Sequence, residues 1–151
     1  MTLERSFVTP ADPDDFEHWL YAMDDALQRF ISDLDESIAL KLDYSEESLE
    51  TIESLILKQY TSVEKILIPA ESYRLDGLTR YVGETFRKAI GGRWEIRLDD
   101  PRYAFHGLPQ LTGFSPRATP ICPHSLVTAA VDRRQGNYLR TILENVKRRL
   151  R

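Results

Sequence analysis

The sequence predicts an α+β fold, in which a helical first half packs on a small antiparallel sheet of roughly two to four strands and helices follow at the C-terminal end. Apolar residues recur every three or four positions through most of residues 13–90, which is the spacing of amphipathic helices. Around residues 94–98 the spacing changes to two, which is typical of a half-buried strand. A chain of 151 residues is long enough to bury its own core, so we expect residues 1–151 to form a single domain.

The first predicted helix covers residues 13–36 and follows an irregular lead-in of residues 1–11. Asp12 is a suitable N-cap, and Pro13 suits the first helical position. The apolar stripe of this helix consists of Phe16, Trp19, Leu20, Met23, Leu27, Phe30, Ile31 and Leu34. Such an aromatic face is able to line a groove for a partner, but we expect it to be core, because the apolar stripe of a helix usually faces the protein interior.

Two shorter helical segments are expected before the central helix. The first follows Ser45, a suitable N-cap, and its apolar stripe runs from Leu49 to Tyr60. The second covers residues 63–67 and stops before Pro69, because proline lacks the N–H that a helix interior needs. The residues after Pro69 lead into the central helix.

The central helix is predicted to end at residue 90 and to bury one face. Its apolar residues at helical spacing are Leu75, Leu78, Tyr81, Val82, Thr85, Phe86, Ala89 and Ile90. Its charged residues fall mainly off that face: Asp76, Arg80, Glu84, Arg87 and Lys88. Glu84 precedes Lys88 by four residues, an order that favours a helical ion pair worth about 0.2–0.5 kcal/mol. We therefore expect these charges to lie away from the core.

Two glycine positions punctuate this helix. Gly91 is predicted to end it, because a residue without a Cβ readily takes the positive φ that commonly closes a helix. Gly83 lies inside the helix, where glycine is about 1 kcal/mol less favourable than alanine. We interpret Gly83 as a place where a neighbouring element packs closely on bare backbone, and the approach of a ligand or partner is the alternative.

Strands and two more helices are expected in the remaining third of the chain. Residues 94–98 should form the first strand, residues 103–108 a second strand, and residues 119–122 a short third strand. A helical segment is predicted from Pro123 to a break at residues 135–137. A last helix then follows at residues 138–151, with Leu139, Ile142, Leu143, Val146 and Leu150 turned inward.

Six residues of the central stretch form a short pattern, in which a tyrosine, a glycine and a glutamate are followed by two glycines and a tryptophan. They are Tyr81, Gly83, Glu84, Gly91, Gly92 and Trp94. Together with the strand after them and the helix that opens at Pro123, they resemble a set of small uncharacterised bacterial proteins, some of which are similar to immunity proteins encoded beside toxins. The similarity spans roughly residues 42–146. It implies a protein-binding role and brings no catalytic residues with it.

Charge is divided unevenly along the chain, although the net charge is only −4. Residues 1–60 hold 15 acidic and 4 basic side chains, a balance of −11, whereas residues 61–151 hold 9 acidic and 16 basic side chains, a balance of +7. We favour mutual attraction of the two halves within the fold, and an interaction surface is the alternative. In that alternative, a basic protein would meet the outer faces of the first helix, which carry Asp14, Glu17, Asp24 and Asp25.

The sequence contains few residues in patterns typical of catalysis or of metal and cofactor binding. Cys122 is expected to be a buried, inert thiol, and a catalytic pair of Cys122 with His106 or His124 is the alternative. Phosphate-binding loops, a nucleophile elbow and metal-ligand spacings are absent, so we expect no metal and no cofactor. These features make catalysis the weaker expectation.

The single cysteine excludes an internal disulfide bond and fits a reducing cytoplasm. The first residues lack the basic end and apolar core of a secretory signal, and no run of about 18 apolar residues is available to span a membrane. Basic residues such as Arg148 and Arg149 gather near the C-terminal end, but the chain as a whole is acidic, with a pI of about 5.4. Nucleic-acid binding is therefore not favoured, because nucleic-acid-binding domains are usually basic.

The favoured hypothesis is a non-enzymatic cytoplasmic protein that binds another protein, as an immunity or adaptor factor does. The alternative is a small-molecule-binding or hydrolytic protein whose pocket no motif marks. The first hypothesis depends on the resemblance and on the lack of catalytic motifs, and the second requires a cavity that only the folded chain can reveal.

Overall fold

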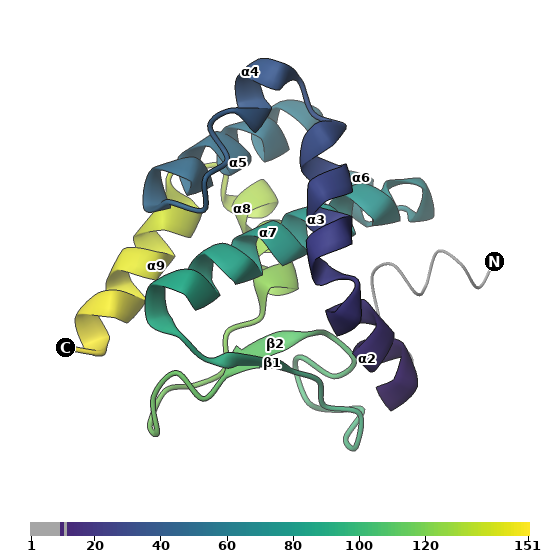
Figure 1. The fold of residues 1–151 in the computed structure, drawn as a ribbon, viewed down its shortest axis with the longest axis vertical. Coiled ribbons are helices and arrows are strands. Elements are labelled where there is room, and N and C mark those ends of the chain that lie inside the picture. Colours follow the sequence, from purple (N-terminus) through teal and green to yellow (C-terminus); the bar gives the residue numbers. More distant parts are fainter. Residues whose placement is uncertain (1–9, 11) are drawn as a thin grey trace.

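Most other elements pack against one long helix, α7 (Ser72–Ile90), which runs through the middle of the molecule (Figure 1). The computed structural model describes residue 10 and residues 12–151. The irregular lead-in predicted for residues 1–11 therefore lies outside the described residues, apart from Pro10, which belongs to no helix or strand.

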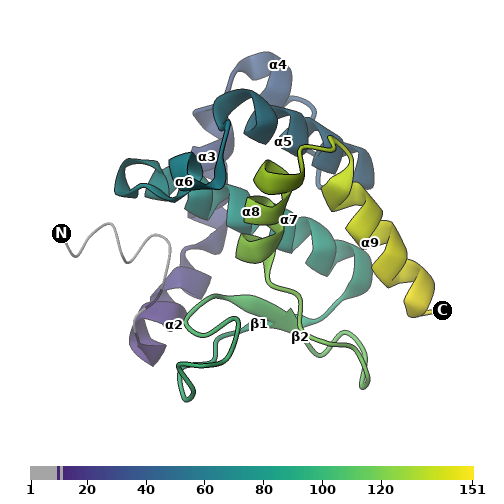
Figure 2. The same ribbon diagram turned by 180° about the vertical axis from the view of Figure 1, so that it is seen from behind.

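The order of the elements confirms the predicted α+β class. Before α7 come α2 (Pro13–Tyr21), α3 (Met23–Ser32), α4 (Glu36–Ala39), α5 (Glu46–Gln59), α6 (Val63–Leu67) and the 3-10 helix η1 (Pro69–Glu71). After α7 come β1 (Arg93–Glu95), β2 (Gln110–Thr112), α8 (Pro123–Arg133) and α9 (Tyr138–Arg149). The two strands pair antiparallel, with Trp94 opposite Leu111. This small sheet lies at one end of the helical body (Figures 1 and 2).

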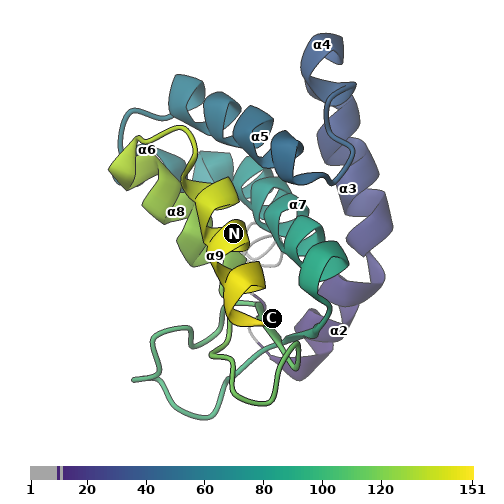
Figure 3. The same ribbon diagram turned by 90° about the vertical axis from the view of Figure 1, so that its left-hand side faces the viewer.

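The helices form layers on two sides of α7. Figure 3 shows α3 on one side of α7 and α8 with α9 on the other, and both α3 and α8 contact α7. As a result α7 is buried nearly all round and not on one face, as the sequence had suggested. Glu84 is 5% exposed, so the prediction that it lies away from the core is wrong. The same prediction is wrong for Asp76 and Arg80, which are only 4% and 3% exposed. Their burial is tolerated because Arg80 Nε donates to Asp76 Oδ2 at 2.7 Å, which pairs the two charges.

The helix predicted for residues 13–36 is not one element. It is interrupted at Ala22, whose ψ of 3° lies far from the helical value, and α4 then forms a separate turn. In an unbroken helix the carbonyl of Trp19 would accept a hydrogen bond from Met23 N–H, but here it accepts one from Arg80 Nη1 at 2.8 Å. The break thus coincides with a tertiary contact from α7, which sequence spacing does not reveal.

The strand predictions are only partly correct. The first strand is shorter than residues 94–98, and residues 103–108 form turns, so the second strand is β2 instead. Three backbone N–H groups in that stretch bond three residues back: Tyr103 to Asp100, His106 to Tyr103, and Leu108 to Phe105. Those N–H groups are therefore not available to a sheet. The strand expected at residues 119–122 is reduced to a single bridge between Leu111 and Ile121.

Attraction between the acidic and basic halves is confirmed where α5 meets α9. Lys147 pairs with Glu46, and Arg140 Nη1 lies 3.4 Å from Glu50 Oε1. The buried carboxylate of Glu53 accepts the N–H groups of Tyr138 and Leu139 at 3.1 and 2.8 Å, and so satisfies the free N–H groups at the start of α9. Part of the uneven charge therefore holds the fold together.

Candidate functional site

The six-residue pattern folds into a joint between α7 and β1. The indole Nε1 of Trp94 donates to Glu84 Oε2 at 2.8 Å, and the ring lies directly over Gly83. A Cβ added to Gly83 would lie 2.0 Å from Cη2 of Trp94, so only glycine fits there. The interpretation of Gly83 as a close-packing position is confirmed, and its neighbour is the tryptophan of the same pattern.

The other members of the pattern secure the two ends of this joint. The hydroxyl of Tyr81 accepts from the N–H of Tyr44 at 2.9 Å and donates to Ser48 Oγ at 2.8 Å, which ties α7 to the start of α5. Gly91 ends α7 with a φ of 83°, as predicted, and Gly92 follows with a φ of 95°. All six side chains or backbone positions thus serve the packing of α7 against its neighbours.

The expected ion pair between Glu84 and Lys88 is replaced by other contacts. Glu84 accepts from Arg87 Nε and Nη2 at 2.8 and 3.1 Å in addition to the indole, while Lys88 Nζ lies 5.1 Å from the ring centre of Tyr44. Burial alone would raise the pKa of Glu84, but the hydrogen bonds from Arg87 and Trp94 outweigh it and hold the pKa below its usual value. The carboxylate is therefore charged and fully engaged.

The four carboxylates proposed as a binding surface are exposed, although the helix that carries them is broken in two. They are Asp14, Glu17, Asp24 and Asp25. Within residues 10 and 12–151, the ion pairs involve none of these four. Their charge is therefore available to solvent or to a partner, in contrast to the carboxylates of α5.

One cleft is lined both by residues of the six-residue pattern and by one of the four carboxylates. It has a volume of about 380 Å³ and lies between the α2–α3 break and the joint of α7 with β1. Its lining consists of Leu20, Tyr21, Met23, Asp24, Glu84, Arg87, Arg93 and Trp94. Tyr21 is 95% exposed, because the break places it at the outer corner of the two helices. We call Tyr21, Asp24, Asp25 and this lining the α2–α3 cleft surface.

Asp14, Glu17 and Asp25 do not line this cleft. Glu17 lines a separate, more open groove with Phe16 and residues 96–99, on the other part of α2. Asp14 lies in the first turn of α2, where its charge favours the helix N-terminus. The structure therefore brings only Asp24 of the four into contact with the cleft.

Sequence reasoning missed three residues of the cleft: Tyr21, Arg87 and Arg93. Tyr21 left a signal, because it is an aromatic residue off the apolar stripe of its helix. Arg87 and Arg93 left none, since their position at the cleft depends on how β1 returns against α7. The hydrogen bond to Glu84 raises the pKa of Arg87, and the nearby charge of Asp24 adds to this shift. The cleft thus combines opposite charges with an exposed aromatic ring.

The catalytic alternative for Cys122 receives no support from its surroundings. The side chain is 3% exposed, and burial raises the pKa of the thiol above its ordinary value, opposed mainly by a hydrogen bond involving Ser125. His124 is partly buried, which lowers its pKa and disfavours the imidazolium form that would stabilise a thiolate. The burial of Cys122 confirms that part of the prediction.

Cys122 is expected to react slowly in the native protein. With a chromogenic thiol reagent at neutral pH, the labelling rate should be at least about tenfold lower than in the urea-unfolded chain, because the thiolate is both rare and inaccessible. Since burial raises the pKa of the thiol, the native rate should also rise later with increasing pH than the unfolded rate. Equal rates in the folded and unfolded states, with circular dichroism showing intact helices, would contradict this prediction.

The described residues also bear on metal binding and on membrane insertion. Among the described residues, no group of three or more His, Cys, Asp or Glu side chains is arranged to hold a metal ion. None of the described helices has the length and apolar character needed to cross a bilayer. No protein-family model matches this chain, and no curated protein or solved structure resembles it closely enough to count as a match.

Proposed function

We propose that this protein is a non-catalytic binding protein that recognises a basic protein partner through the α2–α3 cleft surface. The observation that carries the proposal is Tyr21, which is 95% exposed beside a cleft and next to carboxylates without an ion pair among the described residues. Tyrosine is enriched among the residues that dominate binding energy at interfaces. The immunity or adaptor role implied by the residue pattern belongs to this class of function.

The charges of the surface explain how such a partner would be selected. Asp24 and Asp25 attract basic groups over distances of about 10 Å at moderate ionic strength, which accelerates association and makes it salt-sensitive. Tyr21 then offers a rigid ring for a cation or an apolar side chain at short range. On this basis the carboxylates set the association rate, and Tyr21 sets the dissociation rate.

The test uses two matched charge reversals. In Asp24→Lys/Asp25→Lys the proposed surface changes sign, whereas Glu64→Lys/Asp132→Lys makes the same charge change at exposed positions on α6 and α8. Those two helices face the viewer in Figure 2, on the other side of α7 from α3. Proteins captured from the source cells by each form are identified, and the candidate partner is then purified for kinetics.

The proposal expects a basic protein that binds the parent and the control variant but not Asp24→Lys/Asp25→Lys. With the purified partner, the reversal should lower the association rate about tenfold or more at low salt, and Tyr21→Ala should mainly raise the dissociation rate. Equal binding by all forms would refute the proposal. So would a bound species that proves to be nucleic acid and is lost on changing Arg148 and Arg149.

A further inference from the structure

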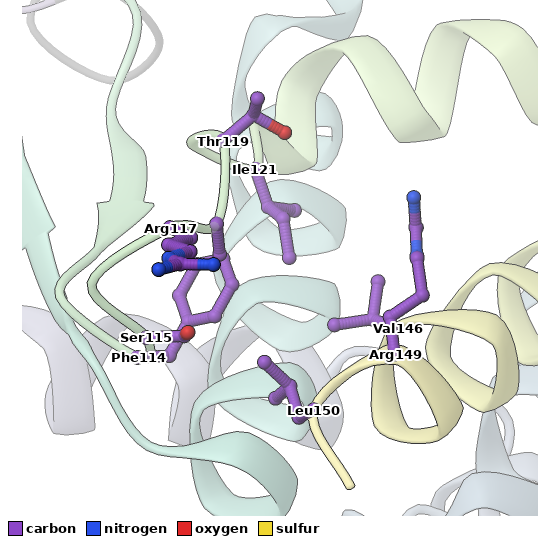
Figure 4. Close-up of a pocket in the computed structure, with 9 residues that line it drawn as sticks. Phe114, Ser115, Arg117, Thr119, Ile121, Val146, Arg149 and Leu150 are labelled. Carbon is purple, nitrogen blue, oxygen red and sulfur yellow. The ribbon is translucent and has the colours of Figure 1, made fainter.

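A second cavity lies away from the α2–α3 cleft surface, between the loop after β2 and the last turns of α9 (Figure 4). Its volume is about 260 Å³. The residues around it are Phe114, Ser115, Arg117, Ala118, Thr119, Ile121, Val146, Arg149 and Leu150. We call it the arginine pocket. None of these lining residues belongs to α7 or to the α2–α3 cleft surface.

The arginine pocket separates apolar and polar groups in a way that suits an amphipathic ligand. Phe114, Ile121, Val146 and Leu150 provide apolar surface, and Figure 4 shows Arg117 on the loop side of this surface and Arg149 on the α9 side. The hydroxyls of Ser115 and Thr119 are further polar groups of the lining. Arg117 and Arg149 thus line the same cavity from different elements.

The charge of the pocket is unbalanced. No Asp or Glu side chain belongs to its lining. Neither Arg117 nor Arg149 takes part in an ion pair within the described part of the chain. Both arginines are exposed at one cavity whose lining holds no carboxylate, so an anion placed between them is attracted by both. The planar fork of arginine also matches a carboxylate geometrically, with two parallel N–H···O bonds.

We propose that the arginine pocket binds a small organic acid whose apolar body occupies the cavity and whose carboxylate lies between Arg117 and Arg149. The volume of the pocket limits the size of the apolar part of the ligand. A cavity of about 150 Å³ holds benzene, so a pocket of about 260 Å³ has room for an aromatic ring with a short acidic arm. Arylalkanoates and medium-chain carboxylates fit this description, and the pocket is smaller than a typical drug-sized site.

The test is a titration of the full chain with phenylpropionate, in which nitrogen–proton NMR spectra are recorded at each ligand concentration. Saturable shifts are expected for residues 114–121 and 146–150. Arg117→Gln and Arg149→Gln should each weaken binding about tenfold or more, equivalent to about 1.4 kcal/mol. Arg148→Gln is the matched control, because Arg148 is exposed in the same turn of α9 but does not line the pocket, and it should change the affinity less than about twofold.

Phenylpropionamide separates recognition of the carboxylate from simple filling of the cavity. Because the amide has the same body and no charge, it should bind about tenfold more weakly than the acid or worse. Equal affinity of acid and amide would overturn the proposal, and so would an equal effect of Arg148→Gln and Arg149→Gln. A lack of saturable shifts up to about 10 mM phenylpropionate would also overturn it. All the variants alter exposed side chains, so we expect them to fold like the parent. The same spectra check that folding is retained.

Discussion

Arg80→Met is expected to lower the free energy of unfolding by about 3–5 kcal/mol, because it leaves a buried carboxylate without its cation. Arg80 and Asp76 are both buried, and Arg80 Nη1 also donates to the carbonyl of Trp19 at 2.8 Å. The guanidinium carbon lies 4.2 Å from the ring centre of Trp19, so packing and a cation–π contact are lost as well. Since this contact occurs at the α2–α3 break, the variant should loosen the helices that carry Tyr21.

Urea unfolding followed by circular dichroism measures this loss, with Arg102→Met on the exposed loop as the control. Burial already raises the pKa of Asp76 although Arg80 opposes the shift, so loss of the cation in Arg80→Met should raise the folded-state pKa further above the unfolded value of about 3.9. The protonated carboxyl is tolerated in the interior, so the stability deficit should shrink as the pH falls and grow as it rises. A loss below about 1 kcal/mol, independent of pH, would show that the pair is not a stabilising contact.

Trp94→Ala is expected to destabilise the protein by about 3 kcal/mol or more, because the ring joins β1 to α7. The ring packs against the core, makes an edge-to-face contact with Trp19 at 4.9 Å between ring centres, and donates to Glu84. Phe86, fully buried on the same helix, belongs to the same core. A melting temperature within a degree or two of the parent would show that this joint does not organise the fold.

A double-mutant cycle of Trp94 and Gly83 tests whether the indole ring packs directly on the glycine. Gly83→Ala in the parent should cost about 2 kcal/mol or more, since its Cβ would lie 2.0 Å from Trp94 and the ring also packs edge-to-face with Trp19, which restricts its movement. In the Trp94→Ala background the same change should be close to neutral, because alanine favours the helix and the next nearest atom after the indole, Pro123 Cγ, lies at 3.1 Å. Additive losses in the two backgrounds would contradict direct packing of Trp94 on Gly83.

Much of the fold could be predicted from local patterns. The helical spacing located α5, α6, α7, α8 and α9, and Asp12 and Ser45 cap their helices through side-chain hydrogen bonds as predicted. Gly83 and Gly91 also behave as expected. These predictions succeed because helix spacing, caps and stops depend on residues within a few positions of one another.

The candidate sites could be predicted only in part. The exposure of Asp24 and Asp25 followed from their place off the apolar stripe. The position of Tyr21 at a corner did not, because the break at Ala22, where Arg80 from α7 bonds to the carbonyl of Trp19, is not marked by the local spacing. The arginine pocket was invisible in the sequence, since its lining comes from residues 114–121 and 146–150, which share no local pattern.

Local sequence patterns specify where α5 to α9 form and end, that a small antiparallel sheet is present, and which carboxylates of residues 13–36 face solvent. Tertiary structure decided the rest, because the deciding contacts join residues far apart in the chain. Arg80, 61 residues away in the chain, donates to the carbonyl of Trp19 at the break between α2 and α3. Glu84 bonds to Arg87 and Trp94 instead of Lys88, since β1 returns across Gly83 and presents an indole N–H. Such competition for a buried hydrogen-bonding group is resolved only when the elements pack.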